Sequence, residues 1–514
     1  MCSVPGMKKS SAIPLVVAII VLCVFLDTPR AQVFSETGNQ QVLSSPSADR
    51  GKRPAYKKGE LLVRFKKGAT PEQIAALHAK LGSVVIKTIP RPRVQRIKLK
   101  AGFSEVDLLN KYRESGIVEH VERHALRYPQ ATPDDPDFSV QWGLKQIKAD
   151  ALWDITTGSR DVIVAVIDSG VDYTHPDLTG NIWINTAEQN GLPGIDDDGN
   201  GYIDDIRGWD FADNDNDPFD PSGPWDYFDH GTHVAGIIGA AGNNGIGVSG
   251  VNWKIRIIPL KVKTDSDKEF TLEAILEAIE YAIANGAQVV NCSFGGEGYS
   301  GDEYAAFASL REKGILAVCG AGNDSYDMDI AEKIYPACYD LDNILSVGSS
   351  NETDTLADSS NYGEKTVDVA APGNSIYSTL PGSAYGYMNG TSVATPHVTG
   401  LAGLIFGQCP SAAYTDVRAS IISNVDRILS LAGRIASGGR INALAARTAM
   451  TLPGDISGDC LADATDAALA LRILSGQDAS FPCPLSSCKF DVNGDNLIGH
   501  EEAIYILQKL SGSR

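Results

Sequence analysis

Short, entirely apolar runs alternate with helical segments over residues 131–450 of this 514-residue chain. The runs include "VIVAVID" (162–168), "AQVVNCSF" (287–294) and "ILAVCGAGN" (315–323), and "TLEAILEAIEYAIANG" (271–286) has the spacing of an amphipathic helix. A strand without polar positions must be buried on both faces, as it is in a parallel sheet covered by helices. The pattern predicts an α/β domain built on a parallel sheet with helices on both faces.

The length and the net charge of the chain limit its organisation and its partners. A chain of this length is expected to form about two to four domains. The formal net charge of −20 disfavours nucleic acid and anionic membranes as partners. An acidic chain of this kind is compatible with bound cations.

The N-terminus has the layout of a secretory signal peptide. Lys8 and Lys9 precede an apolar run at 12–26, which is shorter than the ~20 residues that a helix needs to span a bilayer. We expect residues 1–31 to be removed, residues 32–55 to form a linker, and the protein to be secreted. Pro29 matches the usual cleavage pattern poorly, so a retained leader that anchors the protein to the cell envelope is the alternative.

A second, smaller module is expected over residues 56–130. "GELLVRF", "VQRIKLK" and "VEHVERHALRY" alternate as strands do, while "TPEQIAALHAKLG" and "SEVDLLNKYRESG" have helical spacing with start and stop residues. The order strand-helix-strand-helix-strand predicts an α+β fold.

The cysteine count predicts at least one unpaired thiol. Two of the nine cysteines lie in the leader, which leaves an odd number in an oxidising compartment. Cys483 and Cys488 are close enough in sequence to pair, with Cys460 as a competing partner. Buried free thiols are expected at Cys292, Cys319 and Cys338, which lie in apolar or small-residue settings.

Three separated positions could supply the groups of nucleophilic catalysis. Asp168 ends the strand "VIVAVID", His230 opens "HGTHVAG", and Ser392 lies in "NGTSVATPHVTG" in front of an apolar run. Each residue also has a structural interpretation, since Asp is common in turns and Ser at helix starts. His230 and His233 could form a metal pair, but the Glu of a zinc "HExxH" motif is absent. Together the three residues supply a nucleophile, a base and an orienting acid.

The chain resembles the subtilisin-type (subtilase) serine proteases. The chain order Asp, His, Ser is that of subtilisin, and the matching motifs are "VAVIDSGVD", "HGTHVAG", "SFGG", "GAGN" and "GTSVATPHV". The resemblance covers residues 131–450 and implies a parallel seven-stranded sheet with helices on both faces. It also implies a serine endopeptidase that hydrolyses protein substrates through an acyl-enzyme.

The resemblance assigns the catalytic roles. Ser392 would be the nucleophile, His230 the base that accepts its proton, and Asp168 the acid that orients the imidazole. Asn323 would donate its side-chain amide to the oxyanion, together with the Ser392 backbone N–H. The structural alternative is that Asn323 is an ordinary turn residue after a glycine.

The resemblance also locates the substrate groove. The two backbone walls that hold the substrate as an additional strand correspond to Ser293, Phe294, Gly295 and Gly296 and to Gly320, Ala321 and Gly322. Ile334 stands where the family has the floor of its specificity pocket. We expect a shallow pocket that favours medium-sized apolar side chains over large aromatic ones.

The module at 56–130 resembles the inhibitory propeptide of the same family, for which the expected fold is ferredoxin-like. Such a module acts as an intramolecular inhibitor, and cleavage near Tyr128 to Ala131 would release the mature enzyme. A substrate-binding accessory domain is the alternative.

The stretch "DDDGNGYID" (196–204) is spaced like a calcium-binding loop. Positions 1, 3, 5 and 9 of the loop hold Asp196, Asp198, Asn200 and Asp204. Arg207 stands at position 12 in place of the usual acid, so Asp205 or a distant residue must replace it. A solvated acidic loop is the alternative. A further family calcium site would use Asp177, Asn244 and Asp135.

Residues 453–514 contain two more loops of this kind, each followed by an apolar helix. The loop positions hold Asp455, Ser457, Asp459, Asp463 and Asp466 in the first copy and Asp491, Asn493, Asp495 and Glu502 in the second. A duplicated loop-helix resembles a dockerin module, a small all-α pair of EF-hand-like units with a cohesin-like protein as partner. Cys460 and Asn496 replace the usual Gly at position 6, and Cys adopts the left-handed turn poorly.

The rival function from another class is a non-catalytic, calcium-dependent adhesion or scaffold component that docks through this C-terminal module. The complete set of catalytic residues argues against it.

Overall fold

The computed structural model describes residues 56–91, 93–100, 105–125, 132–220, 229–264, 270–450, 453–457, 460, 462–475, 492, 498 and 500–511. The expected signal peptide and linker lie outside the described residues, as do the expected cleavage segment, Cys483 and Cys488. Among the described residues, the structure contains no helix with the length and apolar character that crossing a bilayer requires.

The N-terminal module folds in the order β-α-β-β-α-β. Its elements are β1 (Tyr56–Phe65), α2 (Pro71–Leu81), β2 (Val84–Ile89), β3 (Val94–Lys98), α3 (Glu105–Glu114) and β4 (Val118–Ala125). The strands form an antiparallel sheet in the order β2-β3-β1-β4. The sequence prediction missed β2 because "VVIKTI" does not alternate, and all of its residues are exposed.

Local sequence sets the limits of α2. The Thr70 side chain accepts from the N–H of Gln73, and the Gln73 side chain accepts from the N–H of Thr70. Pro71 occupies the first turn, and Gly82 ends the helix at a φ of 65°. The helices contribute to a core that contains Leu61, Val63, Ile97, Leu108, Tyr112 and Val121.

A mixed sheet of nine strands organises the larger domain. In spatial order the strands are β16 (Asp426–Arg427), β17 (Gly439–Arg440), β13 (Val369–Pro372), β12 (Ile344–Ser350), β10 (Leu316–Gly320), β8 (Val289–Cys292), β5 (Gly158–Asp168), β7 (Lys254–Lys261) and β6 (Trp209–Asp210). The expected parallel sheet is present from β17 to β6, but the prediction of seven strands is wrong, because the sheet has nine and one edge is antiparallel. β16 pairs antiparallel with β17, and the two-residue edge strands are too short to show a periodic pattern.

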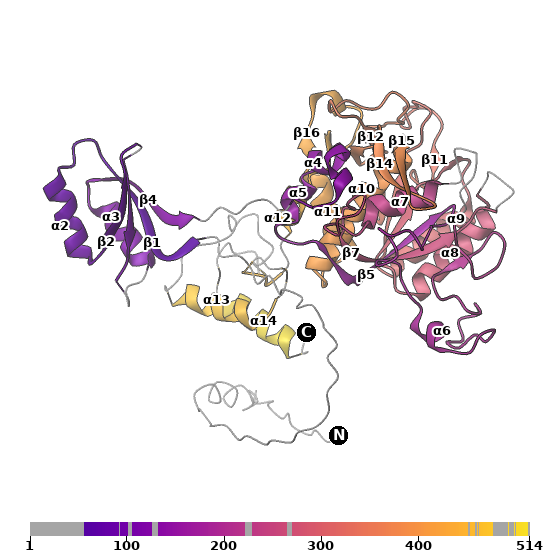
Figure 1. Cartoon of the computed structure of the whole chain (residues 1–514), viewed down its shortest axis with the longest axis horizontal. Helices are drawn as coiled ribbons and strands as arrows, with labels where there is room; N and C mark the ends of the chain where they lie inside the picture. Colours follow the sequence, from indigo (N-terminus) through magenta and orange to yellow (C-terminus); the bar gives the residue numbers. More distant parts are fainter. Residues whose placement is uncertain are drawn as a thin grey trace, which may run out of the picture. The chain divides into compact units, whose positions relative to one another are not determined.

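Helices cover both faces of this sheet, as the sequence predicts (Figure 1). On β5, Val162, Val164 and Val166 belong to one buried cluster, which includes residues of α7 (His230–Gly239) and α10 (Thr391–Gln408). Ile163, Ala165 and Ile167 belong to another, with residues of α8 (Leu272–Ala284) and α9 (Gly301–Glu312). Burial of alternate residues in two different clusters explains why residues 162–167 of the strand include no polar position.

Shorter elements complete the domain. They are α4 (Trp142–Gln146), α5 (Ala149–Leu152), α6 (Thr186–Asn190), β9 (Gly296–Glu297), β11 (Ile334–Tyr335), β14 (Ile376–Leu380), β15 (Ala384–Met388), α11 (Tyr414–Ser423) and α12 (Ala443–Ala449), with 3-10 turns at Pro136–Val140 and Leu429–Leu431.

The C-terminal segment contains two helices, α13 (Ala464–Leu474) and α14 (His500–Leu510). Its small core includes Ile456, Ala467, Ala470, Ile498, Ala503 and Ile506. A disulfide joins Cys460 to Cys409, the residue after α10. Cys460 is therefore not a competitor for Cys483 or Cys488, and its partner lies 51 positions earlier, a separation that spacing cannot predict. Cys292, Cys319 and Cys338 are free thiols.

Candidate active site

Asp168 and His230 meet at the carboxyl end of β5. Asp168 is fully buried at the last position of the strand, and His230 is the first residue of α7. The Nδ1 of His230 lies 2.7 Å from Oδ1 of Asp168, which also accepts the N–H of Ser169 at 2.8 Å. Because a carboxylate oxygen only accepts, Nδ1 carries the proton and Nε2 is left as the basic nitrogen.

Two opposing effects set the pKa of His230. Burial lowers it because it disfavours the charged imidazolium, and the charge of Lys263 acts in the same direction. The negative charge and the hydrogen bond of Asp168 raise it and prevail, so the pKa lies above its ordinary value. The Asp168 carboxylate therefore stabilises the imidazolium that forms when His230 accepts a proton.

His233, the second histidine of the motif, does not form a metal pair with His230. It is fully buried, and Nε2 lies 3.0 Å from the carbonyl of Ile376 and 3.2 Å from that of Gly386. Burial lowers its pKa to about 3. This imidazole is neutral, and it joins α7 to the hairpin of β14 and β15.

Ser392 and Asn323 border the same small space above Gly390. Ser392 lies in the first turn of α10, and Gly390 precedes that helix with a φ of 134°. A Cβ on Gly390 would lie 3.2 Å from Ser392 Oγ, 3.2 Å from Asn323 Oδ1 and 3.3 Å from Asn323 Nδ2. Glycine is required here both by the backbone conformation and by the space that a side chain would fill.

The amide of Asn323 has a fixed orientation. Its Oδ1 accepts from the N–H of Thr391 at 2.8 Å and from the Thr391 hydroxyl at 3.3 Å. These two donors identify Oδ1 as the amide oxygen, so the Nδ2 group points the other way and can donate to another acceptor. Asn323 follows β10 and Asp168 ends β5, and both strands pair in parallel with β8. The Asp168–His230 pair and the Ser392–Asn323 pair therefore lie at the same edge of the sheet.

The expected substrate walls follow two neighbouring strands. Ser293 to Gly296 follow β8, and Gly320 to Gly322 follow or end β10. The hydroxyl of Ser293 donates to the carbonyl of Ser392 at 2.7 Å, which ties the first wall to the turn of the candidate nucleophile.

Ile334 fills the space between these walls. A Cβ on Gly295 would lie 2.6 Å from Ile334 Cγ2, and a Cβ on Gly322 would lie 3.2 Å from Ile334 Cγ1. Ile334 is itself buried and pairs with Glu297 across β11 and β9. Its branched side chain therefore lies against both of the expected walls.

Carboxylates of the loop 196–205 gather around Glu188 of α6. Carboxylate oxygens of Glu188, Asp196 and Asp198 lie within 4.8 Å of one another. Glu188 is buried and accepts the N–H groups of Asp197 at 2.7 Å and Asp204 at 3.0 Å. A set of donors made only of oxygens suits Ca²⁺. The sequence missed Glu188 because it precedes the loop and falls outside its spacing.

Asp204 and Asp205, two other acids of this loop, have different surroundings. Asp204 accepts from the N–H of Gly194 at 2.7 Å, and the structure does not bring it into the three-carboxylate group. Asp205 is fully buried and accepts from the Asn200 side chain at 2.9 Å and from the Tyr281 hydroxyl. Asp205 is therefore the acid that lies on the inner side of the loop.

The residues of the further expected calcium site are neighbours. Asn244 Nδ2 donates to Asp177 at 2.9 Å, and Asp135 accepts the N–H groups of Asn243 at 2.8 Å and Asn244 at 2.9 Å. Asp135 and Asp177 are buried. Tyr385 also donates its hydroxyl to Asp177 at 2.9 Å.

The first C-terminal loop turns its acids inward. Asp455 and Asp466 are fully buried. Asp455 accepts the N–H of Cys460 at 2.8 Å, and Asp466 accepts those of Ser457 at 2.7 Å and Asp463 at 2.9 Å. Cys460 adopts the left-handed conformation, with a φ of 69°. In the second loop Glu502 is buried. Four other predicted ligands lie outside the described residues: Asp459 of the first loop and Asp491, Asn493 and Asp495 of the second.

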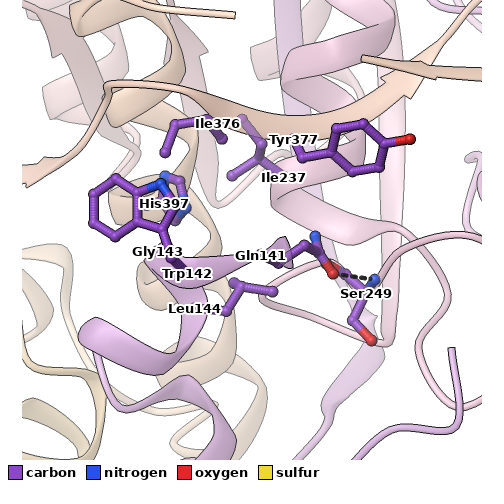
Figure 2. Close-up of a pocket in the computed structure, with 9 residues that line it drawn as sticks. All are labelled: Gln141, Trp142, Gly143, Leu144, Ile237, Ser249, Ile376, Tyr377 and His397. Carbon is purple, nitrogen blue, oxygen red and sulfur yellow. Dashed lines mark hydrogen bonds between the residues drawn. The ribbon is translucent and has the colours of Figure 1, made fainter. Parts of the chain in front are cut away.

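A small cavity lies beside α10 (Figure 2). Its volume is about 10 Å³, and it is lined by Gln141, Trp142, Gly143, Leu144, Ile237, Ser249, Ile376, Tyr377 and His397. That volume holds about one water molecule, so it cannot accept a peptide side chain. The lining contains none of the candidate catalytic residues. We exclude this cavity as the substrate site.

Comparison with known proteins agrees with this geometry. The Subtilase family model matches residues 159–448, which is more than half of the chain, and the model of the fervidolysin N-terminal prodomain matches residues 44–124. The thermophilic serine proteinase of Bacillus sp. (strain AK1) is 35% identical over 77% of this chain and 88% of its own length. Thermitase from Thermoactinomyces vulgaris is 39% identical over 61% of this chain and 98% of its own length.

A solved structure extends the likeness to the fold. A protease from Pseudoalteromonas arctica superposes with a TM-score of 0.51 at 29% identity, over 62% of this chain and 98% of the other. Its likeness supports a subtilisin-like α/β fold with a mixed sheet. The chain belongs to the subtilase family and is a serine endopeptidase with an N-terminal prodomain of the fervidolysin type.

Proposed function

We propose that this chain is a secreted, calcium-stabilised serine endopeptidase that is made as a self-inhibited zymogen and acts through Asp168, His230 and Ser392. The observation that carries the proposal is the 2.7 Å contact between His230 Nδ1 and Asp168 Oδ1. It leaves Nε2 free of a proton and therefore able to serve as a base.

The first half of the reaction forms an acyl-enzyme. As Ser392 Oγ attacks the scissile carbonyl carbon, His230 Nε2 takes the hydroxyl proton and the carbonyl electrons move to oxygen. Asn323 Nδ2 and the N–H of Ser392 donate to this oxyanion. The imidazolium, stabilised by Asp168, then gives its proton to the leaving amine as the C–N bond breaks.

The second half releases the acyl group. A water molecule gives a proton to His230 and attacks the ester carbonyl, and the same two donors hold the oxyanion. The proton returns to Ser392 Oγ as the ester bond breaks, which frees the acid product and restores the enzyme.

Ile334 supports a proposed preference for medium-sized apolar side chains at the cleaved residue. Its side chain lies close to Gly295 and Gly322 of the two expected walls, where it would form the base of the groove. A Leu or Met side chain would fit above it, whereas a Phe ring would need the space that Ile334 occupies.

The prodomain supports the zymogen proposal. Its element order and its strand order β2-β3-β1-β4 are those of a ferredoxin-like fold. Because the module directly precedes the protease domain, its C-terminal end would reach the groove, and cleavage between Tyr128 and Ala131 would release it. The Ser392→Ala protein should therefore accumulate at full pro-form mass if processing is autocatalytic.

Calcium would bind at the Glu188, Asp196 and Asp198 group and in the C-terminal loops, and would stabilise the folded enzyme. The C-terminal segment would be a dockerin-like docking module for a cohesin-like protein. Its exposed apolar residues support a docking role: Leu471, Leu474, Ile504, Leu507 and Leu510.

The decisive test is casein hydrolysis by the Ser392→Ala protein. The proposal predicts that hydrolysis disappears while the fold remains. Ser309→Ala is the matched control, because the Ser309 hydroxyl on α9 donates to the Ala305 carbonyl within the same helix in an exposed hydrogen bond. Hydrolysis that survives Ser392→Ala would show that another residue is the nucleophile.

A further inference from the structure

Asp220 is a fully buried carboxylate close to α7, the helix that begins at His230, and it is not one of the proposed catalytic residues. Its Oδ2 accepts from the Thr232 N–H at 3.1 Å and from the Thr232 hydroxyl at 2.9 Å. Its Oδ1 accepts from the Ser169 hydroxyl at 3.2 Å. Thr232 lies two residues after His230 on α7, and Ser169 directly follows Asp168. One carboxylate therefore bonds the neighbours of two candidate catalytic residues.

Ser169 extends this network to both of them. Its hydroxyl accepts the N–H of Gly231 at 2.9 Å, and its own N–H donates to Asp168 Oδ1 at 2.8 Å. The Asp168 oxygen that receives this N–H is the one that contacts His230. The path Thr232–Asp220–Ser169–Asp168 thus closes a ring of hydrogen bonds around the Asp168–His230 contact.

The start of α7 depends on these bonds. The first N–H groups of a helix have no partner within the helix. Asp220 takes up the N–H of Thr232, and Ser169 takes up that of Gly231. A Cβ on Gly231 would lie 2.0 Å from the Gly170 carbonyl oxygen, so the helix start is pressed against the Ser169 turn.

We propose that Asp220 is a positioning residue of the protease, whose carboxylate holds the start of α7 against the Ser169 turn and so keeps the His230 imidazole aligned with Asp168. The inference rests on the proposed roles of Asp168, His230 and Ser392. Asp220 contacts neither the His230 imidazole nor the substrate, so it acts only by positioning the α7 backbone that carries the His230 side chain.

The charged and titratable groups around His230 come from several elements. Asp168 faces it from β5, Lys263 from the segment after β7, and His233 from α7 itself. Burial and the nearby Asp168 raise the pKa of Asp220. Variants at Asp220 can therefore change the pH profile as well as the geometry, and the readout must report the position of the imidazole directly.

The test compares Asp220→Ala, Asp220→Asn and Asp217→Asn in the secreted enzyme. Asparagine keeps a carbonyl that can accept from Thr232, whereas alanine keeps nothing. Asp217 carries the same charge on the same segment, but it is exposed and its carboxylate accepts from the Tyr173 hydroxyl, away from α7. Three quantities are measured for each protein: kcat and KM on one peptide substrate, the rate of His230 alkylation by a peptidyl chloromethyl ketone, and the melting temperature.

The inference predicts that Asp220→Ala lowers kcat on the order of 10²-fold, since small misplacements of a catalytic group have such effects, and slows alkylation similarly with little change in KM. Asp220→Asn should lie between this variant and the wild type, which keeps the test valid if Asp220→Ala does not fold. Asp217→Asn should match the wild type in all three quantities.

Two results would overturn the inference. One is a folded Asp220→Ala enzyme with wild-type kcat and alkylation rate. The other is a loss of kcat, in either Asp220 variant, that matches the fraction of misfolded protein and leaves alkylation per folded molecule unchanged. Neither result touches the proposed triad, which is tested separately by the loss of hydrolysis in His230→Ala and in Ser392→Ala.

Discussion

The buried imidazole of His233 should make the enzyme lose stability as the pH falls below 6.5. Its Nε2 bonds two carbonyls, so Nε2 carries the proton, and the buried Nδ1 has no hydrogen-bond partner among the described residues. Protonation at Nδ1 would create a charged donor without an acceptor in the core. Burial accordingly lowers the pKa to about 3, against 6.5 for an ordinary histidine.

The direction and size of the effect follow from this difference. In the unfolded chain His233 binds a proton near its ordinary pKa, while in the folded protein it stays neutral down to about pH 3. The contribution is therefore fully present above pH 6.5 and is lost as the pH falls toward 3. One pH unit well below the ordinary pKa corresponds to about 1.4 kcal/mol, and the unfolded histidine is already half protonated at pH 6.5, so a fall from pH 6.5 to 4.5 should cost about 2.3 kcal/mol from His233 alone.

The assay is urea unfolding of the Ser392→Ala protein, in which autolysis is prevented, with and without His233→Gln. Glutamine can donate to the same carbonyls but does not titrate. The variant should be less stable at neutral pH, but its free energy of unfolding should fall by about 2.3 kcal/mol less than that of its parent between pH 6.5 and 4.5. His397, whose pKa burial lowers to about 4, is present in both proteins and cancels. Equal losses in the two proteins would refute the reasoning.

Three other predictions follow from the site. Ile334→Gly should raise kcat/KM for Phe relative to Ala at the cleaved residue by about 10- to 200-fold, the value of a few methylene groups in an apolar pocket; an unchanged ratio would mean that Ile334 does not limit the pocket. Asn323→Ala should lower kcat by about 10²- to 10³-fold with KM little changed, and a fully active variant would remove Asn323 from the oxyanion site. EGTA should lower the melting temperature, because calcium at 100 times its dissociation constant stabilises by about 2.7 kcal/mol; Glu188→Gln should reduce this shift, and equal shifts in both proteins would place the ion elsewhere.

Features that depend on neighbouring residues could be predicted from the sequence. Asp168 at the end of an apolar strand and Ser392 at a helix start follow from local pattern, and the structure places both there. The pairing of Asp168 with His230 came from the family motifs and is present at 2.7 Å.

Features that tertiary contacts create could not be predicted. Glu188 joins the acids of the 196–205 loop from a separate helix, and Cys409 meets Cys460 across 51 positions. The edge strand β16 has two residues and pairs with β17 only because the chain returns to the sheet there. No spacing rule within a short window contains these contacts.

The convergence of His230 and Ser392 on one substrate carbonyl is the claim on which the mechanism rests. A peptidyl chloromethyl ketone measures it directly, because its ketone carbon bonds a serine oxygen while its methylene carbon alkylates a histidine nitrogen. Peptide mapping by mass spectrometry of the inactivated enzyme should find the inhibitor on His230, and His230 labelling should slow strongly in the Ser392→Ala protein. Inactivation with the label on another histidine, or equal labelling of His230 in both proteins, would contradict the account.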